Sequence, residues 1–456
     1  MHKSFSTSLL VSLVLMTFSL SAQQNISGTI KGYSNKKLNL LLLRGDQKIA
    51  IDSVRTDASG NFNFSPSWNL PKGMYLLRTA EGTTIRLIIG SENIRMQSDG
   101  TDGSNPVEFV HSLENQLWYE YFLFKSEAQF KQELLKPILQ QYPEDDLFFQ
   151  QTTEEYERLQ NKLHEIANRI ISQHPESLAA RFIRADLPPE LPLQMTLQQQ
   201  RDHLKKHFFD KVDFGDTLLI NSDLLSRKMI DYLSLYQRQG MGMNEVQIEF
   251  IKALEVILKQ ASVETKVYLF AVEFFIEGFY KMGLTGVSDY LSTLPHLQGD
   301  CLDEFTLLEI DRIAGPYRKI VNGSAAPPIK GTDIKGKLFE LSKDNKKTSL
   351  LVFWSITCPH CLEMIPQLKE LTKNMSDVQV ISVILSHDNS SLRTYLKDEA
   401  LDEWIHIVDG KGWDSQLVDD WMVFGTPTLF VIDPGMRILS KPSGLPELRA
   451  VFQQRQ

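Results

Sequence analysis

Two cysteines stand three positions apart in the sequence Cys358-Pro359-His360-Cys361. They follow an apolar run at residues 350–354 whose composition predicts a buried strand, so the pair is expected where the next helix begins. A thiolate at a helix N-terminus receives unpaired backbone N–H groups and the positive end of the helix dipole, which lower its pKa. Two thiols at this spacing can also close into a disulfide. The pattern therefore predicts thiol–disulfide exchange.

The two cysteines are expected to play different parts in that exchange. Cys358 stands where the helix starts, so we expect it to attack as a thiolate. Cys361 lies further into the helix, more shaded from solvent, and we expect it to resolve the mixed disulfide. Pro359 suits the first helical turn because it has no N–H to lose, and we expect it, together with His360, to tune the thiolate.

A C-x-x-C pair can also hold zinc or haem, but the sequence favours neither. Zinc sites usually need a second pair of ligands, and the only other cysteine is Cys301. A c-type haem requires histidine directly after the second cysteine, where Leu362 stands. We therefore expect no metal and no cofactor, and we expect Cys301 to be an inert, partly buried thiol.

The N-terminus predicts export. Lys3 precedes an uncharged run at residues 9–18, and small residues end at Ala22. This is the pattern of a secretory signal peptide at residues 1–22, with an apolar run shorter than the roughly 20 residues of a membrane span. We expect cleavage, a location in the periplasm or cell envelope, and no stable membrane span in the mature chain.

The charge of the chain gives no support to a nucleic-acid partner. The sequence has 48 basic and 57 acidic side chains and a net charge of −9. No block of lysines and arginines could follow a phosphate backbone. Three cysteines are too few for a disulfide scaffold, so the cysteine pair points to catalysis.

Two stretches with different patterns precede the cysteine pair, which predicts a multidomain protein. Residues 23–104 alternate and turn as β structure does, with Phe62 and Phe64 on one face, and predict an antiparallel β-sandwich or barrel. Residues 105–322 carry apolar side chains at three- and four-residue steps and predict an all-α domain.

Two segments of the helical stretch carry more detailed predictions. Thr152 and Glu155 predict a capping box at a helix start. The apolar run at residues 267–279 is interrupted by Glu273 and Glu277, so it predicts a buried helix rather than a membrane span.

Residues 323–456 predict a third domain, of α/β type. The segment 323–328 is rich in glycine, proline and small residues, which predicts a linker. Strand-like and helix-like segments then alternate, and this order predicts a largely parallel sheet covered on both faces.

This C-terminal stretch resembles the thioredoxin superfamily, and specifically its TlpA/ResA-like exported branch. The resemblance covers roughly the last 130 residues, a typical size for one domain. The residues that carry it are Ala326-Pro327, Phe353-Trp354, Cys358 to Cys361, Pro366 and Gly425-Thr426-Pro427-Thr428. The preceding β and helical stretches resemble the extensions of Gram-negative envelope proteins that carry redox domains.

The resemblance implies a thioredoxin-like fold and an activity as a protein thiol–disulfide oxidoreductase. It implies a cis peptide bond between Thr426 and Pro427, beside the cysteines. An extended substrate segment is then expected to pair with the backbone at Thr426, and Trp354 is expected at the same substrate-binding surface.

Two positions depart from the family pattern. Many thioredoxins carry a buried aspartate where this chain has Val352, and ResA-like proteins often carry a glutamate where it has Met364. Water, or Glu363 if its side chain turns inward, would then take the proton from Cys361.

The direction of exchange is open in the sequence. The tetrad Cys-Pro-His-Cys is similar to that of DsbA, a strong oxidant, whereas the surrounding domain resembles a reductase branch. The potentials of thioredoxin and DsbA differ by about 150 mV, or roughly 7 kcal/mol. We lean to reduction or isomerisation of disulfides in envelope proteins, with electrons supplied by a membrane partner.

Two other functions remain as alternatives. A thioredoxin-fold peroxidase resembles Pro-x-x-x-Thr-x-x-Cys around its reactive cysteine; here Ser355 could replace the threonine, but Leu351 occupies the proline position. A binding or scaffold protein with a redox-responsive thioredoxin-fold clamp would account for the long β and helical stretches, in which no catalytic constellation is evident.

Overall fold

The computed structural model describes residues 24–100, 107–193, 195–293, 304–341, 346–387 and 390–453. The signal peptide expected at residues 1–22 and the cysteine at 301 lie outside these residues. The chain divides into two compact units. The first unit comprises Met1–Leu187 with Asn221–Asp223, and the second comprises Pro188–Ile220 with Leu224–Gln456.

The first unit contains two four-stranded sheets with the orders β4-β1-β7-β8 and β3-β2-β5-β6. Their apolar side chains form one shared core, which confirms a β-sandwich. Strands β1 and β7 pair in parallel, and the other neighbours pair antiparallel. The strands are β1 (Ile26–Ile30), β2 (Lys37–Arg44), β3 (Gln47–Arg55), β4 (Asn61–Phe64), β5 (Gly73–Arg78), β6 (Thr84–Ile89), β7 (Ile94–Ser98) and β8 (Val107–His111).

Three helices complete the first unit: α1 (Leu113–Gln141), α2 (Leu147–Gln173) and α3 (Leu178–Asp186). Strand β8 precedes them, within the stretch expected to be helical. The capping box expected at Thr152 is wrong, because α2 begins earlier, with the side chain of Asp146 accepting from the N–H of Phe148. The hydroxyl of Thr152 instead donates to the Phe148 carbonyl one turn back, at 2.7 Å.

The second unit begins with a run of helices, all of which except the first bury apolar side chains. They are α4 (Leu197–His207), η1 (Thr217–Asn221, whose last residue belongs to the first unit), α5 (Leu224–Ser234), α6 (Met243–Ala261), α7 (Thr265–Lys281), α8 (Thr285–Thr293) and α9 (Glu304–Arg318). Helix α7 contains the apolar run at 267–279 and buries most of it, as predicted. Among the described residues, no helix is long and apolar enough to cross a membrane.

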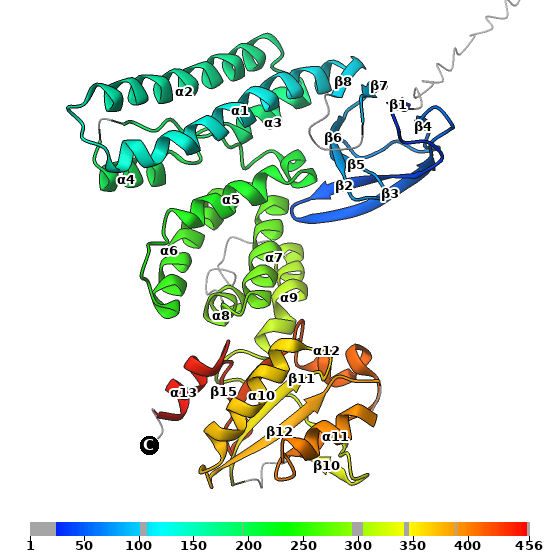
Figure 1. Cartoon of the computed structure of the whole chain (residues 1–456), viewed down its shortest axis with the longest axis vertical. Helices are drawn as coiled ribbons and strands as arrows, with labels where there is room; N and C mark the ends of the chain where they lie inside the picture. The colour runs from blue at the N-terminus through cyan, green and yellow to red at the C-terminus, as the bar shows by residue number, and fades with distance from the viewer. Residues whose placement is uncertain are drawn as a thin grey trace, which may run out of the picture. The chain divides into compact units, whose positions relative to one another are not determined.

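The C-terminal part of the second unit, from residue 323 onward, is an α/β structure drawn from yellow-green to red in Figure 1. Its five-stranded sheet has the order β13-β12-β11-β14-β15. The elements are β9 (Lys330–Thr332), β10 (Leu338–Glu340), β11 (Thr348–Trp354), α10 (Pro359–Thr372), β12 (Val378–Ile384), α11 (Ser390–Asp398), β13 (Ile405–Ile407), η3 (Gly412–Asp414), α12 (Gln416–Asp420), β14 (Thr428–Ile432), β15 (Ile438–Ser440) and α13 (Leu445–Gln453).

This sheet is mixed, not largely parallel as expected. Strands β11, β12 and β13 pair in parallel, but β14 runs antiparallel to β11 and to β15. A short turn joins β14 to β15, and short turns connect antiparallel strands. The expected buried strand at residues 350–354 is nevertheless confirmed, because every residue of β11 is buried.

Strand β11 lies between the two apolar cores of the C-terminal part and contributes side chains to both. Alternate side chains of a strand point to opposite faces. Leu351 and Phe353 enter the core that contains α12, whereas Leu350, Val352 and Trp354 enter the core that contains α10, α11 and α13. The strand therefore fixes the position of whatever follows Trp354.

The segment 323–328, expected as a linker, is held along the sheet. The N–H of Gly323 donates to the Ile438 carbonyl (2.7 Å), and the N–H of Ala326 donates to the Met436 carbonyl (2.8 Å). An isolated bridge joins Ala325 to Arg437 between them. The segment therefore adds to the edge of the sheet beside β15.

Candidate functional site

Cys358 occupies the N-cap of α10, where the sequence predicted it. Strand β11 ends at Trp354, and Ser355 shapes the turn that follows. The Ser355 carbonyl accepts from the N–H of Cys358 (3.1 Å), and its hydroxyl bonds the hydroxyl of Thr357 (2.9 Å). The hydroxyl of Ser355 is thereby engaged in the turn.

The sulfur of Cys358 lies between the start of α10 and the loop before β14. Its Sγ accepts from the N–H of Cys361 at 3.3 Å, and as a thiol it donates to the carbonyl oxygen of Thr426, also at 3.3 Å. The Thr426–Pro427 peptide bond is cis, as the resemblance implies. The structure thus brings Cys358, Cys361, Thr426 and Pro427 together.

The two thiols differ in acidity. Burial by itself would raise the pKa of Cys358, but hydrogen bonds from the side chains of Cys361 and Thr426 and from backbone N–H groups outweigh it, so the pKa lies below its ordinary value. Burial, and then the hydrogen bond with Cys358, raise the pKa of Cys361 to about 12. The outer sulfur is therefore the one poised to ionise.

Cys361 is fully buried in an apolar core. Val352 contributes an apolar side chain to the same core, and Glu363 is exposed, so its side chain does not turn inward. From residue 323 onward, no described aspartate or glutamate is buried. Within this described part of the chain, no buried carboxylate is therefore available to accept the proton of Cys361.

The two residues between the cysteines are exposed. Pro359 occupies the first position of α10, where its missing N–H costs no helical hydrogen bond. His360 contributes its backbone N–H to the sulfur of Cys358, while its imidazole faces solvent. Its contribution to the acidity of Cys358 in the structure therefore runs through the backbone.

Trp354 does not fit the substrate-contacting role expected for it. Its side chain is fully buried, its indole N–H donates to the hydroxyl of Ser382 (2.6 Å), and its ring packs on Tyr395. The alternation of β11 places it on the same face as Leu350 and Val352, inside the core. Trp354 is therefore a core residue at the end of β11, directly before the turn that leads to Cys358.

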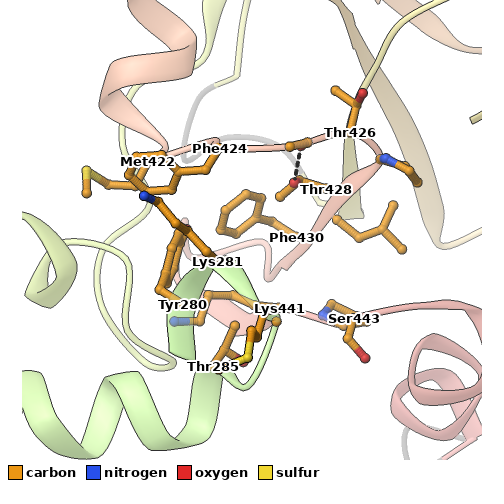
Figure 2. A pocket seen from close by; sticks show the side chains of 16 residues that line it. Tyr280, Lys281, Thr285, Met422, Phe424, Thr426, Thr428, Phe430, Lys441 and Ser443 are labelled. Atoms are coloured by element: carbon orange, nitrogen blue, oxygen red, sulfur yellow. Dashed lines mark hydrogen bonds between the residues drawn. The ribbon is translucent and has the colours of Figure 1, made fainter. Parts of the chain in front are cut away.

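A cavity of about 300 Å³ adjoins the Thr426–Pro427 bond (Figure 2). One wall comes from the end of α7 and the start of α8, and includes Tyr280 and Met282. The other wall comes from the loop before β14 and from residues 441–443. No local sequence pattern identified the α7 wall, because it meets the loop only through the tertiary fold.

Metal ligands were not expected at the site. Within the described ranges, no group of three or more histidine, cysteine, aspartate or glutamate side chains is arranged to hold a metal ion.

Comparison with protein families covers three segments of the chain. Residues 345–438 match a family described as Thioredoxin-like. Residues 24–118 and 148–281 match families described as Domain of unknown function (DUF4369) and Domain of unknown function (DUF5106), respectively. The family comparison thus assigns a fold to the segment that holds the cysteine pair.

Two relatives of known name match the chain. The Thiol-disulfide oxidoreductase ResA of Bacillus subtilis is 26% identical over 127 residues, covering 27% of this chain and 69% of the relative. A Thioredoxin-like protein of Haemophilus influenzae is 30% identical over 132 residues, covering 28% of this chain and 75% of the relative. Both matches span less than a third of this chain.

A solved structure that covers more of the chain is a thioredoxin-like protein from Bacteroides caccae. It is 19% identical, has a TM-score of 0.41, and covers 59% of this chain and 98% of its own.

Proposed function

Because this chain belongs to the thioredoxin superfamily, in its TlpA/ResA-like branch, we propose that it exchanges disulfides with protein substrates of the cell envelope. The observation that carries the proposal is the asymmetry of the cysteine pair. Cys358 is accessible and has a lowered pKa, whereas Cys361 is buried and has a raised one. A nucleophile must be ionised and reachable, and a resolving thiol must be close but slower to ionise.

The first step is attack by the Cys358 thiolate on one sulfur of a substrate disulfide. A bond forms between Cys358 and that sulfur, the substrate disulfide breaks, and the second substrate sulfur leaves as a thiolate. We propose that an extended substrate backbone pairs with the loop at Thr426, and the 3.3 Å distance from the Thr426 carbonyl to the Cys358 sulfur supports this.

The second step is attack by Cys361 on the Cys358 sulfur of the mixed disulfide. Cys361 loses its proton, a Cys358–Cys361 disulfide forms, and the first substrate sulfur leaves. Because none of the described carboxylates from residue 323 onward is buried, the proton passes to water or to the departing substrate thiolate. The substrate gains two electrons and the protein loses two.

We propose reduction as the physiological direction. Continued turnover then needs an external dithiol donor that returns two electrons to the Cys358–Cys361 disulfide, and we place this donor in the membrane. The signal peptide predicted at residues 1–22 supports an envelope location. N-terminal sequencing of the protein from fractionated cells tests it, with cleavage after Ala22 as the expected result.

Trapping tests the exchange itself. In Cys361→Ser, the mixed disulfide cannot be resolved, so covalent complexes with envelope proteins are expected on non-reducing gels and should disappear with a reductant. The control is Cys358→Ser/Cys361→Ser, in which no complexes should form. An empty trap, together with failure of the wild-type protein to reduce a small disulfide, would favour a redox-responsive binding protein instead.

A further inference from the structure

The hydroxyl of Tyr395 is a buried polar group that neither step of the exchange uses. Tyr395 lies in α11, and its hydroxyl oxygen is buried and makes no hydrogen bond within the described residues. A buried polar group without a partner is costly, so folded proteins keep few of them and each one has a cause. The position of this hydroxyl relative to the cysteine pair provides one.

The order of the sheet places α11 beside α10. Strands β11, β12 and β13 are parallel neighbours, and α10 and α11 are the two connections between them. Because such connections are almost always right-handed, both helices cover the same face of the sheet. Leu392 and Leu396 of α11 accordingly enter the core that contains Cys361 of α10.

The side chain of Tyr395 packs against this core. Tyr395 is three residues from Leu392, so the two side chains share one face of α11. Its ring packs on the indole of Trp354, with ring centroids 5.7 Å apart, and Trp354 belongs to the same core as Cys361. The phenol is therefore held at the end of β11, where the turn to the cysteine pair begins.

The phenol of Tyr395 also interacts electrostatically with Cys361. Burial, then the carboxylate of Glu399, and then a negative charge on Cys361 raise the pKa of Tyr395 to about 12. A charge on Cys361 has this effect because the two groups are near each other in the core. With its pKa raised, the phenol keeps its proton at neutral pH and is available as a hydrogen-bond donor.

A buried thiolate gains from such a donor. Cys361 must ionise before it attacks the mixed disulfide, and burial opposes the negative charge on its sulfur. A hydrogen bond to an ionised group is roughly twice as strong as one between neutral groups. The hydroxyl of Tyr395, which is unpaired in the described structure while Cys361 is a thiol, therefore finds its acceptor when Cys361 ionises.

We propose that the hydroxyl of Tyr395 donates a hydrogen bond to the sulfur of Cys361 whenever that sulfur carries negative charge, and thereby speeds the steps in which the charge forms. This inference rests on the proposed function. It adds to the cysteine pair a hydrogen-bond donor that comes from a different helix.

Two steps of the exchange place charge on Cys361. In resolution, Cys361 gives its proton to water or to the departing substrate thiolate, its sulfur bonds to the sulfur of Cys358, and the substrate sulfur leaves. When the external dithiol attacks Cys358 in the disulfide, the sulfur of Cys361 leaves with the electron pair of the broken bond and then takes up a proton. Tyr395 keeps its own proton in both steps.

Stopped-flow kinetics with excess dithiobis(nitrobenzoate) separate attack from resolution. Attack by Cys358 releases one nitrothiobenzoate at a rate that rises with reagent concentration, and resolution by Cys361 releases a second at a rate independent of it. Tyr395→Phe should slow the second release about tenfold, because it removes one hydrogen bond to a charged group. The first release should be unchanged, since the contacts of the Cys358 sulfur are to Thr426 and Cys361.

A second variant preserves the shape of the side chain and predicts the opposite change. Replacement of Tyr395 by a fluorotyrosine whose fluorine is next to the hydroxyl makes the phenol a stronger acid and a stronger donor. The second release should then be faster than in the wild-type protein. Thermal unfolding of each variant checks that it is folded, and if Tyr395→Phe does not fold, the fluorotyrosine variant alone decides.

Tyr75→Phe is the matched control. It removes the hydroxyl of a tyrosine buried in the core of the β-sandwich, which contains neither Cys358 nor Cys361. Both releases should keep their wild-type rates in this variant.

The outcomes separate this inference from the proposed function. If the wild-type protein releases no nitrothiobenzoate, the proposed function fails. If it releases both equivalents but Tyr395→Phe resolves at the wild-type rate, or the fluorotyrosine variant resolves no faster, the inference about Tyr395 is wrong and the exchange activity stands. An equal slowing of both releases in folded Tyr395→Phe would also contradict the inference, because Tyr395 would then act on the structure of the whole site.

Discussion

In each of the two units, polar side chains join a helix to β structure. In the first unit these contacts complete the edge of a sheet, and in the second they hold one wall of a cavity. In the first unit, the side-chain amide of Asn115 in α1 pairs with both backbone groups of Ile88 in the edge strand β6, at 2.7 and 2.8 Å. Arg86 in the same strand makes two hydrogen bonds to Asp223. The hydrogen bonds of Asn115 pair backbone groups that the edge strand would otherwise leave unpaired.

In the second unit, the ion pair of Lys441 and Asp289 joins α8 to the α/β structure, and the same junction leaves a cavity beside Thr426. A buried polar contact therefore affects function only through the element that it positions. The contacts of Asn115 position a sheet edge, whereas those of Lys441 hold one wall of the cavity that Thr426 also lines.

The largest expected effect is the loss of disulfide exchange in Cys358→Ser, which is compared with the loss of stability in Asn115→Ala. Cys358→Ser removes the nucleophile, so reduction of a small disulfide should fall by at least about a thousandfold. Asn115→Ala leaves two backbone groups of Ile88 unpaired and should lower the free energy of unfolding by about 3 kcal/mol. Stopped-flow kinetics and urea unfolding measure the two effects. A loss of exchange rate in folded Asn115→Ala would contradict the division between the units.

A second comparison concerns the two ion pairs. Asp289→Asn leaves the Lys441 ammonium buried without its counter-charge, and should lower the free energy of unfolding by about 3 to 5 kcal/mol. Asp223→Asn should cost about 1 to 2 kcal/mol, because Arg86 and Asp223 are 20% and 26% exposed and water can solvate the remaining charge. Urea unfolding of both variants provides the comparison, and equal losses would contradict it.

The smallest effect concerns two tyrosines. The hydroxyl of Tyr395 in α11 is buried without a hydrogen-bond partner among the described residues, so Tyr395→Phe should leave the free energy of unfolding unchanged or raise it by up to about 1 kcal/mol. The hydroxyl of Tyr75 donates to the Pro71 carbonyl at 2.7 Å, so Tyr75→Phe should cost about 1 kcal/mol. A larger loss for Tyr395→Phe than for Tyr75→Phe would show that the Tyr395 hydroxyl is hydrogen-bonded in solution and would contradict the prediction.

Local sequence patterns predicted the position of the cysteine pair at the start of a helix. An apolar strand, a proline and two cysteines three positions apart suffice to place Cys358 at a helix N-cap, because each cue acts within one helical turn. The cis bond before Pro427 came from the family resemblance. The period of β11 could also have shown that Trp354 shares the buried face of Leu350 and Val352.

Two causes explain the features that the sequence did not predict. One is the presence of two possible N-caps for the same helix, and the other is contact between residues far apart in the sequence. Asp146 and Thr152 both can cap α2, and the helix starts at the earlier one because Leu147 to Gln150 also adopt helical structure. The wall that α7 contributes to the cavity depends on a contact between Tyr280 and Trp421, which are 141 residues apart. No local periodicity in the sequence predicts such a contact. The antiparallel pairing of β14 likewise follows from the route of the chain after Pro427.

The pH dependence of alkylation tests the central claim, the different acidity of the two cysteines. The variants Cys361→Ser and Cys358→Ser each leave one thiol, and iodoacetamide reacts with its thiolate, so each rate rises with pH as that thiol ionises. Because a thiol with a pKa of about 12 is ionised to only about one part in ten thousand at pH 8, Cys361 should react at least about a hundredfold more slowly than Cys358 there.

The rate for Cys358 should reach half its maximum at a lower pH than the rate for an unperturbed cysteine, because the pKa of Cys358 is lowered. The rate for Cys361 should still be rising above pH 10. Equal rates at pH 8, or a lower midpoint for Cys361 than for Cys358, would contradict the assignment of Cys358 as the attacking residue and Cys361 as the resolving one.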